Sequence, residues 1–192
     1  MAVQLIVGLG NPGSQYAHTR HNAGVWMVDM LAEQYHFKLQ REKKFHGEYC
    51  HHIINGQRIH ILFPHTFMNN SGDAVQAVAS YYKLSPESIL VIHDELDLLP
   101  GNVKLKHSGG HAGHNGLRSL ISQLNSTDFW RIRIGIGHPG QRDMVASYVL
   151  SPPSQSEYQK IQQAMVNVSQ VFSSLLTGDF AGATRKLHAK ET

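Results

Sequence analysis

The sequence predicts a single α/β domain, for three reasons. Two short runs, residues 5–7 and 89–92, are apolar throughout and partly β-branched, as is typical of strands buried on both faces of a sheet. Other stretches repeat apolar residues every three or four positions, which predicts amphipathic helices between the strands. With 192 residues and 41% hydrophobic residues, the chain can bury one sizeable core.

The elements follow in order along the chain. We expect a central strand at 5–7, a helix at about 23–35 capped by Asn22, and a hairpin of 47–54 and 57–63 around the type I′ turn Asn55-Gly56. A helix through 74–82, capped by Asn70 or Ser71, precedes a strand at 89–92 and an edge strand at 103–106. The remaining elements are a short helix at 117–124, a strand at 129–139 and a long helix at 158–175 that stops near Gly178. Between the last strand and the last helix lies a polar stretch long enough to serve as a lid.

Composition excludes several classes of protein. No apolar run approaches the ~20 residues of a membrane span, and residues 1–5 lack the features of a signal peptide, so we expect a cytosolic protein. Cys50 is the only cysteine, so the chain cannot form an intrachain disulfide. Because neighbouring strand residues point to opposite faces, Cys50, His51 and His52 cannot all bind one metal ion.

Basic residues are unevenly distributed, although the net charge is only +3. Residues 101–150 contain six lysines and arginines against two aspartates, whereas residues 85–99 contain four carboxylates and no base. This excess indicates either a face that contacts phosphates or an ordinary solvated surface.

Polar residues gather where the expected strands end, and ligand sites of open α/β sheets lie at such ends. The first junction, 8–22, combines three glycines with a run of polar side chains that includes Asn11, Tyr16 and His21. At the second junction, Phe67 and Met68 form a hydrophobic staple or project with Asn69 into the same cleft.

The third junction, 93–97, is acidic, and Asp94 directly follows a buried strand. Asp94 can orient an imidazole, bind a divalent ion together with Asp97, or belong to a solvated acidic turn. Further along, the glycine-rich stretch 108–118 opens a helix, and the helix amino terminus favours an anion such as phosphate.

These residues favour hydrolysis by water. The spacing G-x-G-x-x-G occurs at 8–13, but the second strand lacks a clear terminal Asp or Glu about twenty residues on and the polar run delays the helix, so NAD binding is disfavoured. The chain lacks a G-x-S-x-G elbow and a plausible cysteine nucleophile. His21 can serve as a base held by Asp94, and the amides of Asn11, Asn69 and Asn115 can donate to an oxyanion, which suits an ester substrate.

Several motifs together resemble bacterial peptidyl-tRNA hydrolases. They are residues 8–13, Thr19-Arg20-His21-Asn22-Ala23-Gly24, Thr66-Phe67-Met68-Asn69, His93-Asp94-Glu95-Leu96-Asp97, Gly113-His114-Asn115-Gly116-Leu117-Arg118 and 133–139. The resemblance implies a monomeric cytoplasmic enzyme without metal or cofactor, built as one domain over 1–192. Its fold would be a three-layer sandwich with a twisted mixed β-sheet flanked by helices, a lid at about 138–153 and C-terminal helices at about 154–190.

The same resemblance implies roles for individual residues in cleaving the ester between a peptide and the 3′ ribose of tRNA. His21 would activate water, Asp94 would stabilise and orient His21, and Asn11 would contact the peptide beside the ester. The residues implied to bind the remaining substrate are Tyr16, Phe67, Met68, Asn69, His114 and Asn115, and those implied to hold phosphates of the acceptor stem are Lys104, Lys106 and Arg133. Phe63 and His107-Ser108 depart from the family pattern at positions that bear on tRNA docking.

Two other classes remain as alternatives. A metal-dependent phosphoesterase that uses Asp94 and Asp97 would lose its activity on chelation. An RNA-binding module without catalysis would bind its ligand without turnover, although the sequence has no obvious aromatic stripe for stacking bases.

Overall fold

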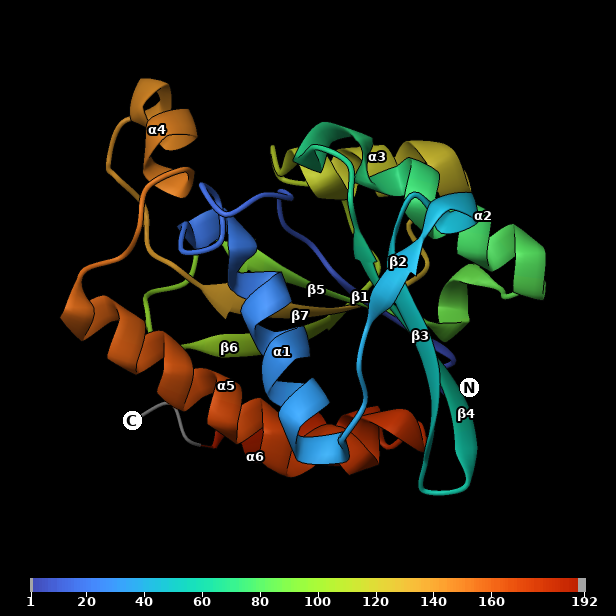
Figure 1. Ribbon diagram of the computed structural model, residues 1–192. Helices are drawn as coiled ribbons and strands as arrows, with labels where there is room; N and C mark the ends of the chain where they lie inside the picture. Colours follow the sequence, from blue (N-terminus) through green and yellow to red (C-terminus); the bar gives the residue numbers. More distant parts are fainter. Residues whose placement is uncertain (1, 190–192) are drawn as a thin grey trace.

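A computed structural model describes residues 2–189 and shows a seven-stranded mixed sheet between two layers of helices (Figure 1). The strands are β1 (Leu5–Gly8), β2 (Gln40–Glu42), β3 (Gly47–Ile54), β4 (Gln57–Pro64), β5 (Ile89–Glu95), β6 (Val103–His107) and β7 (Trp130–Gly135), in the order β2-β3-β4-β1-β5-β7-β6. The α-helices are α1 (Ala23–Tyr35), α2 (Ser71–Tyr82), α3 (Asn115–Leu124), α4 (Val145–Val149), α5 (Gln155–Leu176) and α6 (Phe180–His188). Position 190, the expected end of the C-terminal helices, lies outside the described residues.

The central strand is β1, as predicted, and it pairs in parallel with β4 and β5. Leu5 and Val7 pack into the core beneath α2 and α3, whereas Ile6 packs into the core beneath α1 and α5. This alternation explains why the strand is apolar at every position, because both of its faces are buried.

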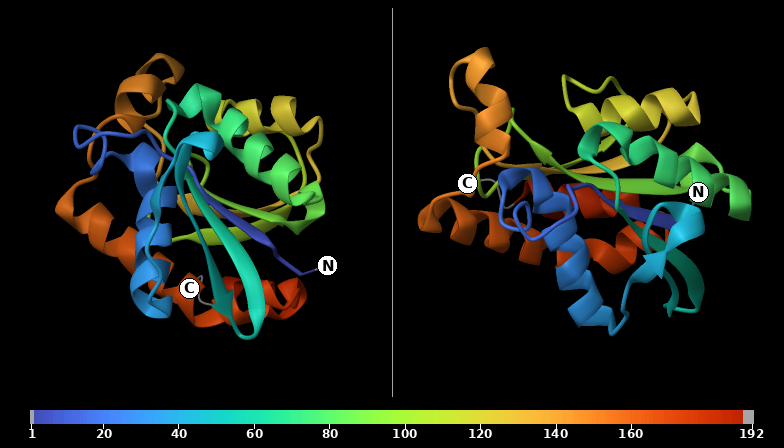
Figure 2. Two further views of the ribbon diagram at one scale, coloured as in Figure 1. Left: turned by 45° about the vertical axis from the view of Figure 1, so that its right-hand side comes forward. Right: turned by 45° about the horizontal axis from the view of Figure 1, so that its top comes forward.

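The two helical layers cover opposite faces of the sheet (Figure 2). Helices α2 and α3 pack on one face, and α1, α5 and α6 pack on the other. The three-layer α/β fold is therefore confirmed. Among the described residues, no helix has the length and apolar character needed to cross a membrane.

Local sequence patterns predicted most elements correctly. Helix α1 has the expected bounds, the hairpin turns at Asn55-Gly56 with both residues at positive φ, and β6 forms an edge of the sheet. The long helix α5 ends shortly before Gly178, which has a φ of 88°. Strand β7 is shorter than predicted and ends at Gly135.

Two details of the fold differ from expectation. The stretch predicted only as a polar lid contains α4, whose five residues are too few to show a helical period in the sequence. Asn22 and Asn70 do stand before α1 and α2, but neither side chain caps its helix. The side chain of Asn22 instead bonds to the backbone of the turn after β1.

Close contact between α1 and the sheet depends on Gly24, at the second position of the helix. A Cβ atom at this residue would lie 2.2 Å from the carbonyl oxygen of Ile92 and 2.8 Å from the backbone nitrogen of Leu9. Because backbone atoms cannot move aside as a flexible side chain can, only glycine fits here.

We predict that Gly24→Ala destabilises the protein by about 1–3 kcal/mol or more, as overpacked cores do. The free energy of unfolding in urea measures the effect. Gly110→Ala is the matched control, since a Cβ atom there meets nothing within 4 Å and the residue has no positive φ. Equal stability of the two variants would show that α1 does not need this close contact.

Candidate active site

The candidate site lies at the carboxyl ends of the parallel strands, where the sequence places its polar junctions. Turn 9–22 follows β1 and brings Asn11 and His21 to this edge, and Asp94 lies near the end of β5. Asn69 stands between β4 and α2, and Asn115 begins α3. The topology therefore brings together residues that are far apart in the chain.

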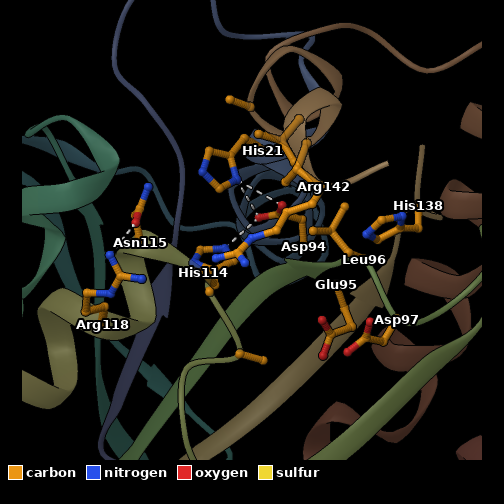
Figure 3. A pocket seen from close by; sticks show the side chains of 15 residues that line it. His21, Asp94, Glu95, Leu96, Asp97, His114, Asn115, Arg118, His138 and Arg142 are labelled. Carbon is orange, nitrogen blue, oxygen red and sulfur yellow. Dashed lines mark hydrogen bonds and ion pairs between the residues drawn. The ribbon is translucent and has the colours of Figure 1, made fainter. Parts of the chain in front are cut away.

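A buried carboxylate links two histidines at the centre of the site (Figure 3). His21 Nδ1 lies 2.9 Å from Asp94 Oδ2, and His114 Nε2 lies 2.8 Å from Asp94 Oδ1. Asp94 is 2% exposed, so its charge is screened little by solvent. An ionised carboxylate only accepts hydrogen bonds, so His21 Nδ1 and His114 Nε2 each carry a proton. His21 therefore keeps Nε2 unprotonated in its neutral form, as a general base requires.

His114 has a second bond that fixes its own tautomer. Its Nδ1 accepts hydrogen bonds from the backbone N–H groups of Gly116 at 3.1 Å and Leu117 at 3.3 Å, which caps α3. The expectation of a phosphate at this helix terminus is corrected here, because the side chain of His114 occupies the N–H groups that an anion would need.

The charges of this cluster shift its pKa values. Burial lowers the pKa of His21, but the charge of Asp94 and the hydrogen bond to it outweigh burial, so the pKa is raised above its usual value. Burial alone would raise the pKa of Asp94, yet His21 and His114 hold it well below its usual range. Burial and His114 lower the pKa of neighbouring His93 to about 3, so this histidine stays neutral.

Asn11 is held in one orientation by three hydrogen bonds. Its backbone N–H donates to Asn22 Oδ1 at 2.9 Å, and its carbonyl accepts from Asn22 Nδ2 at 3.0 Å. Its side-chain Oδ1 accepts from the backbone N–H of Met68 at 2.7 Å, which ties the first junction to the second. Because Oδ1 is occupied, the amide group presents its Nδ2 donor to the site.

Two hollows meet at His21. The first has a volume of about 430 Å³ and is lined by charged and polar groups that include Glu95, Asp97, Arg118 and Arg142. The second has a volume of about 300 Å³ and its lining is more apolar, comprising Asn11, Tyr16, His21, Phe67, Met68, Asn69, Asn115, Ala146, Val149 and Leu150. His21 and Asn115 line both hollows.

The structure thus places Phe67, Met68 and Asn69 beside Asn11, as one of the two sequence interpretations expected. Phe67 is 59% exposed, and its ring lies edge-on to that of Tyr16 with the centroids 6.4 Å apart. It therefore does not form a hydrophobic staple. Met68 is 4% exposed and packs into the core beneath α2.

The three basic residues implied for phosphates lie apart from this cluster, at the β6–β7 edge. In the antiparallel register Lys104 faces Arg133 and Lys106 faces Arg131, so all four share one face of the sheet. Arg133 forms an ion pair with Glu95, with Nη2 and Oε1 2.6 Å apart. Arg131 is buried and donates to the carbonyls of Gly109 and Gly110, so it holds the glycine-rich loop.

His21, Asp94 and His114 are also the residue types that bind metals, and their nearest ligand atoms lie within 4.8 Å of one another. The two nitrogens already bond to the carboxylate, so the cluster is satisfied as a hydrogen-bonded network. Asp97 is exposed and outside this group, which weakens the interpretation of Asp94 and Asp97 as a metal pair.

Sequence reasoning expected a lid at about 138–153 but named none of the residues by which α4 and the preceding Arg142 line the site. Arg142 and Val145 line the first hollow, whereas Ala146 and Val149 line both. Small apolar residues on an expected loop have no chemical signature, so the sequence does not indicate which of them line the site.

Known proteins resemble this chain over nearly its whole length. The family model described as peptidyl-tRNA hydrolase matches residues 5–192. A peptidyl-tRNA hydrolase of Pasteurella multocida is 50% identical over 97% of both chains, and one of Haemophilus influenzae is 48% identical over the same shares. The chain belongs to the peptidyl-tRNA hydrolase family. The crystal structure of peptidyl-tRNA hydrolase from Acinetobacter baumannii superimposes with a TM-score of 0.95 at 43% identity, covering 97% of this chain and 95% of that one.

Membership of the peptidyl-tRNA hydrolase family agrees with the fold and with the motifs at the strand ends. The matching region includes every residue of the His21–Asp94–His114 cluster and both hollows.

Proposed function

We propose that this protein hydrolyses the ester bond between a peptide and the 3′ ribose of tRNA, with His21 as the base that activates water. The observation that carries the proposal is the hydrogen bond from His21 Nδ1 to buried Asp94, which leaves Nε2 as the acceptor at the meeting point of two hollows. The family membership supports the same substrate.

The chemistry needs one base, one oxyanion donor and a water molecule. His21 Nε2 removes a proton from water, whose oxygen attacks the ester carbonyl, while Asp94 stabilises the imidazolium that forms. The Nδ2 donor of Asn11 stabilises the negative charge on the carbonyl oxygen. The tetrahedral intermediate then breaks its bond to the ribose oxygen, which takes the proton from His21. The products are the free peptide acid and tRNA with its 3′ hydroxyl.

The two hollows suit the two unlike parts of such a substrate. The second hollow combines the amides of Asn11 and Asn69 with the apolar side chains of Tyr16, Phe67 and Met68, which fits a peptide. The first hollow, with its charged lining, leaves room for the terminal nucleotide.

The fixed amide of Asn11 also gives a reason to reject free aminoacyl-tRNA. A peptide offers a carbonyl oxygen that can accept from Nδ2. A free aminoacyl group offers a cationic amine, which donates and is repelled by the N–H donor.

We further propose that Lys104, Lys106 and Arg133 contact phosphates of the acceptor stem. They share one face at the sheet edge, on the side of α3, and this face adjoins the first hollow through Glu95, the partner of Arg133. Such an enzyme would act as a cytoplasmic monomer that recycles tRNA from prematurely released peptidyl-tRNA.

We predict that His21→Ala lowers kcat for peptide release from an N-acylated aminoacyl-tRNA by about 10²–10⁴-fold, because the general base is lost. His18→Ala is the matched control, since His18 is exposed in the same turn. Activity of the parent protein should persist in EDTA. A loss on chelation that zinc or magnesium restores would favour the metal-dependent phosphoesterase instead.

The pH profile of the same reaction follows from the raised pKa of His21. The base acts only when neutral, so kcat/KM should rise with pH and reach half its plateau above 6.5, the usual value for histidine. Asp94→Asn should move this midpoint to lower pH and reduce the plateau.

We predict that replacing Lys104 and Lys106 with glutamine weakens tRNA binding and reduces the slope of log K against log salt by about one for each phosphate that the variant no longer neutralises. Lys38 and Lys83, both exposed, provide the double Lys→Gln control with the same change in net charge. An unchanged salt slope in the test variant would exclude the phosphate role.

A further inference from the structure

Arg20 precedes His21 in the chain, but its side chain leaves the site and reaches the segment around α4. Its Nη1 donates to the carbonyl oxygens of Tyr148 at 3.1 Å and Ser151 at 3.3 Å, and to Ser151 Oγ at 2.7 Å. Its Nη2 pairs with Glu157 of α5 at 3.2 Å. Arg20 is 7% exposed, so these bonds replace water.

Stacking adds to the hydrogen bonds. The guanidinium carbon of Arg20 lies 3.9 Å from the ring centroid of Tyr148, and the Tyr148 hydroxyl donates to the carbonyl of Ile136 at 2.6 Å. The backbone N–H of Arg20 also donates to the carbonyl of Ser151 at 3.1 Å. The end of α4 is therefore joined both to the turn that carries His21 and to the end of β7.

Apolar packing also holds the segment, because Val149 is buried in the core and Val145 and Tyr148 pack against it. Residues 141–144, 146, 147 and 150 are exposed, and α4 rises beside the turn after β1 (Figures 1 and 2). Ala146 and Val149 of this helix form the wall shared by the two hollows. The position of α4 consequently sets the width of both hollows.

We propose that Arg20 is a positioning residue that couples the α4 wall to the turn carrying His21, so that the cleft is formed around the base. The proposal rests on the proposed function for its kinetic consequence. Arg20 touches no reacting atom, and its effect is on capture of the substrate: when α4 is released, the hollows lose their common wall and substrate binding weakens.

The test compares Arg20→Met and Arg20→Lys with Arg58→Met, an exposed arginine at the amino end of β4, away from the site. Both Arg20 variants should raise KM by about tenfold, with a smaller change in kcat, since lysine keeps the charge but cannot form the stacked, forked contact. The acidic midpoint of the pH profile should stay unchanged, because the bonds between His21 and Asp94 remain. Arg58→Met should behave as the parent protein.

Hydrogen exchange measured by mass spectrometry provides a second, independent readout. Amides of residues 142–151 should exchange faster in Arg20→Met, while those of β1 and β5 keep their protection. If Arg20→Met does not fold, Tyr148→Leu removes the stacked ring and Ser151→Ala removes the hydroxyl acceptor, and these variants should produce changes in the same direction.

Unchanged KM together with unchanged exchange at 142–151 would overturn the coupling, as would a fall in kcat alone. If the parent protein releases no peptide, the proposed function fails, but faster exchange at 142–151 would still establish that Arg20 holds α4.

Discussion

The site depends on one buried carboxylate that accepts hydrogen bonds from two histidines. Asp94 is almost completely removed from solvent, and a charge in such a place is costly unless it is paired and hydrogen-bonded. His21 and His114 both donate hydrogen bonds to it. This requirement fixes the tautomers of both rings and hence which atom of His21 can take a proton from water.

The fold supplies this carboxylate with partners from distant segments. β5 carries Asp94, the turn after β1 carries His21, and the start of α3 carries His114. The turn can come close because Gly24 lets α1 approach the backbone of β5. His114 also caps α3, so the same ring stabilises a helix and orients the carboxylate. Stability and chemistry share these contacts, and a change at any of the three segments reaches the base.

The sequence predicted those features whose cause is local. The apolar run of β1 and the Asn55-Gly56 turn follow from the burial and the backbone conformation of neighbouring residues. The rule that ligand sites lie where parallel strands end predicted that His21 and Asp94 share one edge of the sheet. These two predictions needed only the order of elements.

Features that depend on distant partners could not be predicted in the same way. Asn22 resembles a helix cap, yet it holds the backbone of Asn11, eleven positions earlier. The glycine-rich loop resembles an anion site in the sequence, but the side chain of His114 accepts from the N–H groups at the helix terminus. In each case a tertiary contact decides between roles that the residue type allows equally.

The most direct test of this mechanism is ¹⁵N nuclear magnetic resonance of the histidine rings as a function of pH. We expect neutral His21 to carry its proton on Nδ1 and its pKa to lie above 6.5, the usual value for histidine. Neutral His114 should carry its proton on Nε2, because Nδ1 accepts from the backbone of α3. A neutral His21 protonated on Nε2 would contradict the mechanism, because that tautomer has no free nitrogen with which to activate water.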